Sequence, residues 1–464
     1  MKKKALDYGL LALLLWSPLP AASVEEWSLF VVELAVAVLA AGYLFLDPKP
    51  ALNPHLPPIL RKLRPAVIAL FGFLALQIVP LPAAVVRILA PGSYGFRKLY
   101  APEFARMKFM SLSIAPSATF GAALFLATLF ILGFLVLRTV VRGRQIRTLL
   151  GVLVGAGVFQ ALYGLFELTR DDPRILFYRK MFSPESVTGT FVNRNHFSGY
   201  LEMIIPLALG LAIARMNMMS FGIKGLREKI LLWTSKGILL NVLILGAAVV
   251  MSVGILLSNS RSGLVVLAFT AFLFFGLSVA AFSRTGFRQP WIGKTVRTTF
   301  LCVTILALTV GVGSTIRRFA LDDLLHEDRP QYWANTVEIF RDFPLFGSGL
   351  GTFASAYGAY ETTSVSELRL DHAHNDYLET LAELGIIGTA LLAGIILFIG
   401  VSAYLAWRQR RNPQSRALAL GGIVSLAGMG LHAVTDFNLR IPANMVLFTA
   451  VLCLTLVMAY YRKS

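Results

Sequence analysis

The chain has 464 residues, of which 56% are hydrophobic and 15% charged, and its formal net charge is +18. Its apolar residues come in blocks of about 20, the length that crosses a bilayer, which excludes a soluble globular protein. In a soluble protein the excess of Lys and Arg would indicate nucleic-acid binding, but in a membrane protein it marks cytoplasmic loops, so we expect no nucleic-acid partner. The two cysteines, Cys302 and Cys453, lie within apolar blocks, which argues against a disulfide framework.

The apolar blocks predict an all-α polytopic membrane protein with about twelve transmembrane helices. The first block resembles a signal peptide, so residues 6–22 are either cleaved or retained as a short span that ends at Pro18 and Pro20. We expect the spans to pack together, so that residues 1–464 form a single membrane domain. In chain order the predicted spans are 6–22, 27–46, 65–81, 117–138, 147–168, 196–214, 236–257, 263–282, 297–315, 380–407, 416–435 and 442–461.

The distribution of charge predicts the orientation of these spans. If the N-terminus is cytoplasmic, every predicted inside segment is basic, as the positive-inside rule requires, and both termini lie in the cytoplasm. The outside segment 316–379 is long and acidic, because from Arg317 to Glu379 it holds five Arg and eleven Asp or Glu. We expect this segment to be an external loop that carries short helices.

One external loop departs from the charge rule. Residues 82–115 alternate apolar and basic side chains, which suits either a short helix on an anionic membrane surface or a solvated loop. Its charged residues are Arg87, Arg97, Lys98, Arg106, Lys108 and the single acid Glu103.

The stretch "LDHAHNDYLETLAELGIIG", Leu370 to Gly388, concentrates groups that can transfer protons. Imidazole titrates near neutrality, so His372 or His374 could take a proton from a sugar hydroxyl while a carboxylate orients the ring. Asp376, Glu379 and Glu383 are spaced three and four residues apart, so they share one helix face. Glu383 would lie about a turn below the membrane surface, where it needs a partner or water. "DHAHND" also offers metal-ligand types, but its spacing matches no strong metal motif, so we expect no metal.

A second group of external polar residues is rich in arginine. Arg261 lies in "SNSRSGL", a tight turn between two spans, and Arg194 and Asn195 lie at the outer end of another span beside His196. The planar fork of arginine suits phosphate oxygens, and a diphosphate would need more than one such fork. The alternative is that these arginines contact lipid headgroups. Further external candidates are Arg317, Arg318 and Arg440.

The segment "DRPQYWANTVEIFRDFPLFGSGLGTF" predicts a short amphipathic helix that lies across the outer opening as a lid. Its expected apolar face carries Trp333, Val337 and Phe340, with Arg329 at the start of the segment. The glycines that follow do not form a dinucleotide fingerprint, since no strand and βαβ unit surround them.

Together "HAHNDYLETLAELGIIG", "RPQYWANTVEIFRDFPLFGSGLGTF", "SNSRSG" and "GTFVNRNHFSGYLEMIIPLALG" resemble the O-antigen ligase and O-antigen polymerase superfamily, over a core at residues 188–388. The resemblance implies a multi-pass inverting glycosyltransferase of the bacterial inner membrane whose active site faces the periplasm. Its donor would be a glycan on undecaprenyl diphosphate, and no metal or other cofactor would be required. By the same resemblance, a histidine of the "HAHN" motif would be the base, with a preference for His374 because Asn375 follows it, and Arg261 and Arg329 would bind the diphosphate.

The acceptor and one rival function stay open at this point. A lipid A-core sugar as acceptor would make the protein a ligase, and the growing end of another lipid-linked glycan would make it a polymerase, which the long external loop slightly favours. A membrane transporter is the alternative class, because Glu33, Glu167, Glu202 and His432 lie within or near spans. We see no paired interrupted helices that would support transport.

Overall fold

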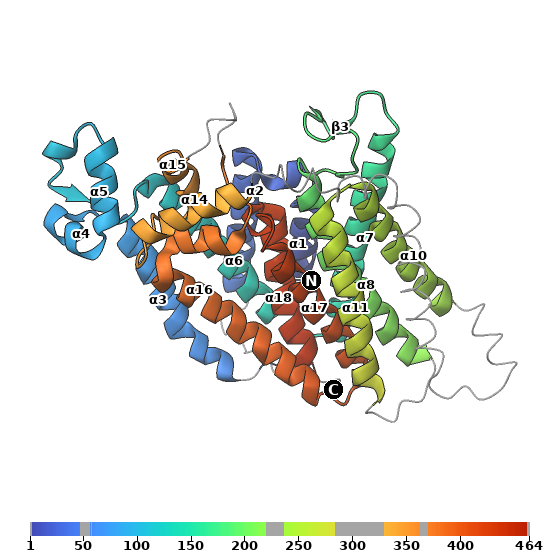
Figure 1. Ribbon diagram of the computed structural model, residues 1–464. Helices are drawn as coiled ribbons and strands as arrows, with labels where there is room; N and C mark the ends of the chain where they lie inside the picture. The colour runs from blue at the N-terminus through green and yellow to red at the C-terminus, as the bar shows by residue number, and fades with distance from the viewer. Residues whose placement is uncertain are drawn as a thin grey trace, which may run out of the picture.

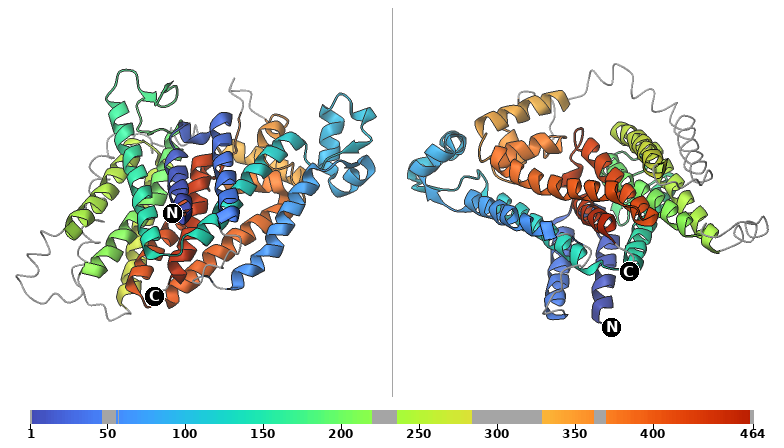
Figure 2. Two further views of the ribbon diagram at one scale, coloured as in Figure 1. Left: turned by 180° about the vertical axis from the view of Figure 1, so that it is seen from behind. Right: turned by 90° about the horizontal axis from the view of Figure 1, so that it is seen from below.

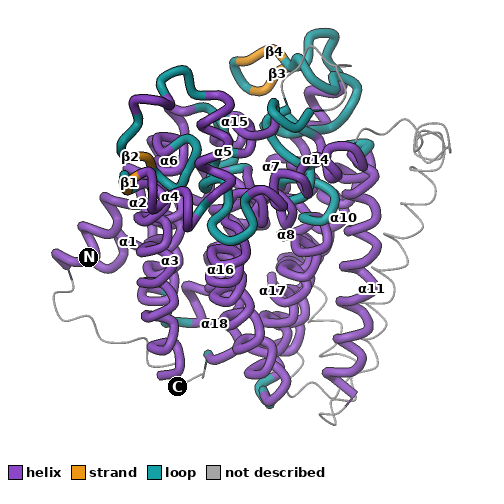
Figure 3. Tube along the Cα trace, turned by 60° about the vertical axis from the view of Figure 1, so that its left-hand side comes forward, coloured by secondary structure: helices purple, strands orange, loops and turns teal. Residues whose placement is uncertain are grey.

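The computed structural model describes residues 2–46, 56, 58–219, 236–283, 329–361 and 370–461. Within these ranges the chain is helical apart from loops and two minimal hairpins, in agreement with the predicted all-α polytopic fold (Figure 3). The first hairpin pairs β1 (Leu81–Pro82) with β2 (Phe109–Met110), and the second pairs β3 (Arg174–Ile175) with β4 (Tyr178–Arg179).

The long helices form a bundle whose members run from one end of the molecule to the other (Figures 1 and 2). They are α1 (Lys2–Trp16), α2 (Glu26–Leu46), α3 (Leu63–Ile78), α6 (Pro116–Thr139), α7 (Gly143–Leu168), α8 (Arg194–Met219), α10 (Lys236–Leu257), α11 (Arg261–Ser283), α16 (Asp376–Gln409), α17 (Pro413–His432) and α18 (Pro442–Tyr460). The shorter helices are α4 (Ala83–Leu89), α5 (Pro91–Tyr100), α14 (Arg329–Asp342) and α15 (Phe353–Tyr357), with 3-10 turns η1 (Ala21–Ser23), η2 (Pro58–Lys62), η3 (Phe104–Arg106) and η4 (Asn438–Arg440).

Eight helices in the described ranges are long and apolar enough to cross a membrane: α2, α6, α7, α8, α10, α11, α16 and α18. The predicted count of twelve is therefore not confirmed. Helices α1 and α3 coincide with predicted spans but have only 15 and 16 residues. Helix α17 matches the span predicted at 416–435 but is not among the eight. The span predicted at 297–315 lies outside the described residues.

The centre of the bundle is formed by α8, α17 and α18. The apolar window of α8 is 94% buried inside the protein, whereas that of α2 is 22% buried, so α8 is surrounded by protein and α2 lies at the edge. Helices α8 and α17 touch through glycines, since a Cβ at Gly421 would lie 2.6 Å from the Pro206 carbonyl oxygen. Such close backbone approach is how small residues hold membrane helices together. Because α17 is enclosed by protein, it tolerates polar residues that a lipid-facing helix would not.

Helix α16 is broken about two and a half turns after its start, where Gly385 has φ 60° and ψ −171°. A glycine-rich turn fills the break: the Pro344 carbonyl accepts from the amide of Ile386 at 2.8 Å, and the Ser348 amide donates to the Ala382 carbonyl at 2.9 Å. Gly347, at φ 71°, approaches so closely that a Cβ would lie 2.1 Å from the Glu383 carbonyl oxygen. Irregular backbone at such a depth is stable only when protein satisfies it, as it does here. The glycines therefore serve the packing of α16.

The loop predicted at 82–115 folds into a small lobe that projects sideways from the bundle (Figure 1). It consists of α4, α5, η3 and the β1–β2 hairpin, packed around the buried Val86, Ala90, Met110 and Leu112. The structure thus has a folded unit where the sequence predicted either a single short helix or a solvated loop.

The two ends of the bundle differ in the segments that they carry. The C-terminus lies at the end opposite α14, α15 and the β3–β4 hairpin (Figure 1). The basic connection that holds Arg408, Arg410 and Arg411 lies at that end, since Arg410 donates to the Tyr461 carbonyl. This separation of basic and site-bearing ends fits the predicted orientation, which stays a proposal.

Candidate functional site

Two polar clusters meet at the turn between α17 and α18. Helix α17 ends at His432, the backbone then folds back so that the Asp436 amide donates to the His432 carbonyl at 3.2 Å, and η4 follows. This turn presents Asp436 on one side and Arg440 on the other. We call the residues around them the Asp436 cluster and the Arg440 cluster. The first comprises Asp436, Asn195, His196, Arg329 and His374, and the second Arg440, Asp376, Glu379, Glu383 and His372.

The Asp436 cluster places one fully buried carboxylate among donors from three separate segments. Asn195 Nδ2 donates to Asp436 Oδ2 at 2.5 Å. His374 Nδ1 lies 3.3 Å and His196 Nε2 3.6 Å from Oδ1 of the same carboxylate. Arg329 Nη2 lies 3.6 Å from Oδ2. Burial alone would raise the pKa of Asp436, but the adjacent His196 and His374 rings hold it well below its ordinary value, so the group is ionised.

The backbone of His374 is held in an uncommon conformation. Its φ is +52°, in the left-handed region that a residue with a side chain rarely adopts. Two residues of α14 fix it there: the Trp333 indole donates to the His374 carbonyl at 3.3 Å, and the Tyr332 ring stacks on the imidazole at 6.2 Å. Such strain costs on the order of 1 kcal/mol and is concentrated at functional sites.

The Arg440 cluster surrounds one guanidinium with acids. Arg440 lies 2.6 Å from Glu383, 3.2 Å from Glu379 and 3.9 Å from Asp376. The common face predicted for these carboxylates on α16 is confirmed, and so is the partner expected for Glu383. Burial alone would lower the pKa of Arg440, but Glu383 and Glu379 raise it above its ordinary value.

His372 belongs to this second cluster. Its Nδ1 lies 2.9 Å from Glu379 Oε1, while Glu379 Oε2 accepts from the Ala373 amide at 2.8 Å. Burial works to lower the pKa of His372, but the charge of Glu379 outweighs it and raises the pKa. His372 is therefore protonated over a wider pH range than a free histidine.

Phe437 joins the two clusters. Its ring centroid lies 4.4 Å from that of His372, 4.5 Å from that of His196 and 4.7 Å from that of His374. Sequence reasoning missed both Phe437 and Asp436, because both lie more than 60 residues beyond the "HAHN" motif and nothing in their local pattern marks them. His196 and Arg440 are external polar candidates in the sequence, but nothing in their local pattern indicates their partners.

The remaining predicted site residues lie on segments that contact the Asp436 cluster. Arg261 begins α11, and its neighbours bond to the cluster's surroundings: Ser260 donates to Asn195 at 2.7 Å, and Thr435 donates to Ser262 at 3.1 Å. Arg194 begins α8, immediately before Asn195. Asn375 has a structural role that we did not predict, since its side chain caps α16 by accepting from the Tyr377 and Leu378 amides at 3.1 and 3.0 Å.

Helix α14 forms where a short helix was predicted, but it buries a different face, and its role as a lid stays a prediction. The residues turned inward are Asn335, Thr336 and Ile339, while Trp333, Val337 and Phe340 are only partly buried. The polar pair is accommodated because Asn335 donates to the Tyr357 hydroxyl at 3.1 Å and Thr336 donates to the Tyr332 carbonyl at 2.6 Å.

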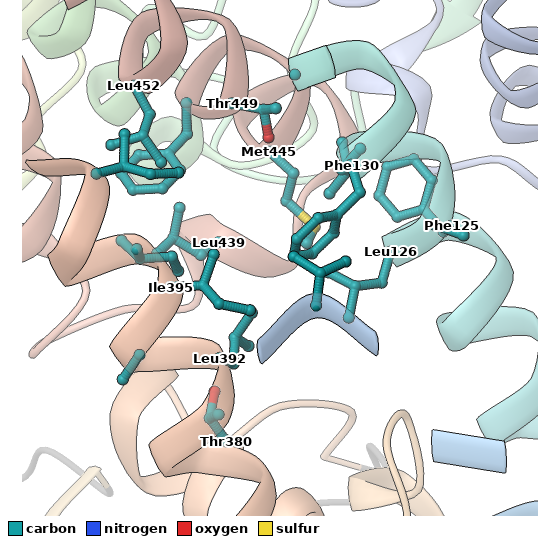
Figure 4. Close-up of a pocket in the computed structure, with 18 of the residues that line it drawn as sticks. Phe125, Leu126, Phe130, Thr380, Leu392, Ile395, Leu439, Met445, Thr449 and Leu452 are labelled. Atoms are coloured by element: carbon teal, nitrogen blue, oxygen red, sulfur yellow. The ribbon is translucent and has the colours of Figure 1, made fainter. Parts of the chain in front are cut away.

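A cavity of about 1040 Å³ opens beside the Arg440 cluster, between α3, α6, α16 and α18. Its polar boundary is formed by His372, Asp376 and Arg440. The rest of its wall is mostly apolar, as Figure 4 shows for Phe125, Leu126, Phe130, Leu392, Ile395, Leu439, Met445 and Leu452. The arrangement suits a molecule with a long apolar part and a polar head.

The described part of the chain contains no group of three or more His, Cys, Asp or Glu residues arranged to hold a metal ion.

The fold defines a multi-pass membrane protein with two clusters of ionisable side chains at one end of its bundle. Residues 246–393 match the family model described as O-Antigen ligase, which confirms the predicted O-antigen ligase and polymerase superfamily. The match includes Arg261, Arg329 and His374, whereas Asp436 and Arg440 lie beyond it. A search of curated proteins found no match. The match supports a membrane glycosyl-transfer role in O-antigen or polysaccharide assembly.

Proposed function

We propose that the protein is an inverting, metal-independent glycosyltransferase that moves a glycan from undecaprenyl diphosphate to an acceptor sugar hydroxyl at the periplasmic face. The observation that carries this proposal is the meeting of His374 and Arg329 around the buried Asp436. A base and a cation within one cluster are what a transfer from a diphosphate requires. The candidate base and the candidate diphosphate-binding arginines lie in the core 188–388, which includes the loop 316–379, whereas Asp436 lies beyond it in the same membrane domain.

The donor diphosphate binds on the Asp436 side. Arg329 is in contact with Asp436, and Arg261 and Arg194 begin helices that adjoin the cluster. The Arg440 side is less suitable, because Arg440 is already surrounded by three carboxylates that would repel a diphosphate. The apolar cavity that suits the isoprenoid tail opens on the Arg440 side, so the donor would cross the turn at Phe437, with its tail in the cavity and its diphosphate at Arg329.

In the reaction the acceptor hydroxyl oxygen forms a bond to the anomeric carbon from the face opposite the diphosphate. The bond from that carbon to the diphosphate oxygen breaks, and its electron pair leaves with the diphosphate, which inverts the configuration. His374 Nε2 takes the hydroxyl proton, while Nδ1 faces Asp436, whose negative charge stabilises the imidazolium. Arginine forks stabilise the charge on the leaving group.

His372 is the alternative base. Its contact with Glu379 at 2.9 Å gives it an orienting carboxylate, but it lies in the acidic cluster and its pKa is raised, so less of it is neutral at pH 7. We favour His374 because it shares a cluster with Arg329, where the leaving group is bound. If Glu379, Glu383 or Asp376 acted as base instead, loss of both histidines would leave transfer intact.

The deciding experiment incubates purified protein with undecaprenyl-diphosphate glycan, with and without lipid A-core. A glycan joined to lipid A-core identifies a ligase, and a lengthened lipid-linked glycan identifies a polymerase. The same reactions run with EDTA test metal independence, which predicts unchanged transfer. If neither product forms, and the protein instead moves the glycan across the membrane of sealed vesicles, the result would contradict transferase activity. It would support the transporter alternative.

The periplasmic face is tested separately. Glu185 is exposed in the loop between β4 and α8, at the end of the bundle that carries the site. A cysteine at this position, in a chain lacking Cys302 and Cys453, should react with a membrane-impermeant maleimide in cells with a permeabilised outer membrane. Labelling only after inner-membrane lysis would reverse the orientation.

A further inference from the structure

The lobe formed by residues 81–112 is not used by the proposed reaction, yet its surface is unusual. It has a small apolar core of its own, and Arg97 is buried within it, donating to Ser111 Oγ at 2.9 Å and to the Ser113 carbonyl. The lobe is thus a folded unit with an internal polar support. Its outer surface combines two kinds of side chain that are seldom exposed together in a solvated loop.

The first kind is large and apolar. Ile88 is 80% exposed, Leu99 77%, Phe109 63% and Tyr100 55%. On α4 the exposed Val85, Ile88 and Leu89 are spaced three and four residues apart and share one face, while Val86 and Ala90 turn into the core.

The second kind is basic. Arg87, Lys98, Arg106 and Lys108 are exposed, and Glu103 is the only exposed acid in the lobe, which leaves a net charge of 4 − 1 = +3 on its surface. Mixed basic and apolar exposure is the composition of segments that lie on anionic membranes.

We propose that this lobe is a membrane-surface anchor that binds the anionic headgroups of the surrounding bilayer, with its exposed apolar side chains inserted at the headgroup boundary. Its place in the fold supports this occupant. β1 follows α3 after two residues and β2 is followed by the apolar span α6, so both connections hold the lobe where spans leave the membrane. The lobe also projects sideways from the bundle at the level of α14 (Figure 1), so a bilayer that surrounded the bundle would lie against it.

The lobe contacts the C-terminal end of α14, the helix that carries Arg329. A Cβ at Gly92 would lie 2.0 Å from the Asp342 carbonyl oxygen at the end of α14, and the ring centroids of Phe96 and Phe343 are 6.2 Å apart. A lobe fixed on the lipid surface therefore supports α14 from its C-terminal end.

The test uses the full chain without Cys302 and Cys453, carrying Leu99→Cys labelled with an environment-sensitive fluorophore. It is reconstituted in nanodiscs of phosphatidylcholine alone, or of phosphatidylcholine with phosphatidylglycerol, with spin-labelled lipids as quenchers. We expect the emission to be blue-shifted, and the quenching by spin-labelled lipids to increase several-fold, when phosphatidylglycerol is present. The variant with Arg87, Lys98, Arg106 and Lys108 all replaced by Gln should lose that increase.

Two controls make the outcome specific. A label at Glu185→Cys, also exposed at this end, should not gain quenching, and Arg174→Gln with Arg179→Gln on the β3–β4 hairpin should leave the signal at residue 99 unchanged. Emission typical of water in both membranes would overturn the proposal. The proposal would also be overturned if, in detergent, the blue shift depended on protein concentration and copies of the chain cross-linked at residue 99. The lobe would then bind a second copy of the chain and not lipid.

Discussion

The two polar clusters are built from opposite charges. In the Asp436 cluster a single acid is surrounded by histidines, an amide and an arginine at 2.5 to 3.6 Å, and His374 and Arg329 remain partly exposed. In the Arg440 cluster a single arginine is surrounded by acids, the two nearest at 2.6 and 3.2 Å, and those carboxylates are almost completely buried. Arg329 is more exposed than Arg440 and, among the described residues, contacts one carboxylate rather than three, so we propose that the first cluster accepts the substrate. The three buried carboxylates around Arg440 favour a supporting role for the second cluster.

The comparison predicts that the largest loss of activity comes from His374. His374→Asn tolerates the left-handed backbone at φ +52° better than alanine would, so it removes the base with little loss of structure. We expect turnover to fall about 10²- to 10⁴-fold, the range for a positioned base, with donor binding largely retained. Purified-enzyme kinetics with the lipid-linked donor measure both quantities.

The matched variant is His372→Asn, which changes the neighbouring ring in the acidic cluster. If His372→Asn proved severe and His374→Asn mild, the two histidines would exchange roles. Near-normal transfer in both single variants and in the double variant would make the histidines structural.

The arginines should separate binding from stability. Arg329→Lys keeps the charge but loses the planar fork, and loss of one charge-assisted hydrogen bond to the diphosphate should raise the donor KM about tenfold. Arg440→Lys should instead lower the melting temperature, since one ammonium cannot satisfy three buried carboxylates. Kinetics and thermal unfolding of both variants test whether Arg329 acts in binding and Arg440 in stability. Equal effects of the two changes on donor KM would contradict this assignment.

Part of the Arg440 cluster could be predicted from the sequence, whereas the Asp436 cluster could not. Residues on one helix have fixed spacing, so the shared face of Asp376, Glu379 and Glu383 could be predicted from three- and four-residue steps. Asp436 could not, because its contacts with α8 and α14 depend on how distant helices pack. Helix α14 shows the same limit: its existence followed from composition, but its buried face depended on the partners of Asn335 and Thr336.

Asp436 predicts a specific dependence of stability on pH. Its pKa is lowered in the folded protein, so its contribution is fully present above the ordinary pKa of aspartate and is lost as pH falls through the lower folded value. Asp436→Asn should therefore lower the melting temperature at neutral pH, by an amount that corresponds to about 3 kcal/mol. The difference from the parent protein should shrink in strong acid. Melting curves in detergent across the pH range test this, and a difference that grew toward acid would contradict the assignment.

Substitution of Phe437 should have the smallest effect on kcat of these changes, and it tests whether the two clusters depend on each other. Its ring touches histidines of both, at centroid distances of 4.4 Å to His372 and 4.7 Å to His374. Aromatic pairs of this kind contribute about 0.5 to 1.5 kcal/mol, so Phe437→Leu should lower kcat roughly threefold to tenfold, while Phe437→Tyr should keep most of it. If the ring only filled space, leucine would preserve both kcat and its pH profile. If the ring fixes the positions of the two imidazoles, Phe437→Leu should alter the acid limb of the pH profile of kcat. Phe437→Tyr should then keep the profile of the parent protein. A loss of kcat in Phe437→Leu with an unchanged pH profile would show that the clusters act independently.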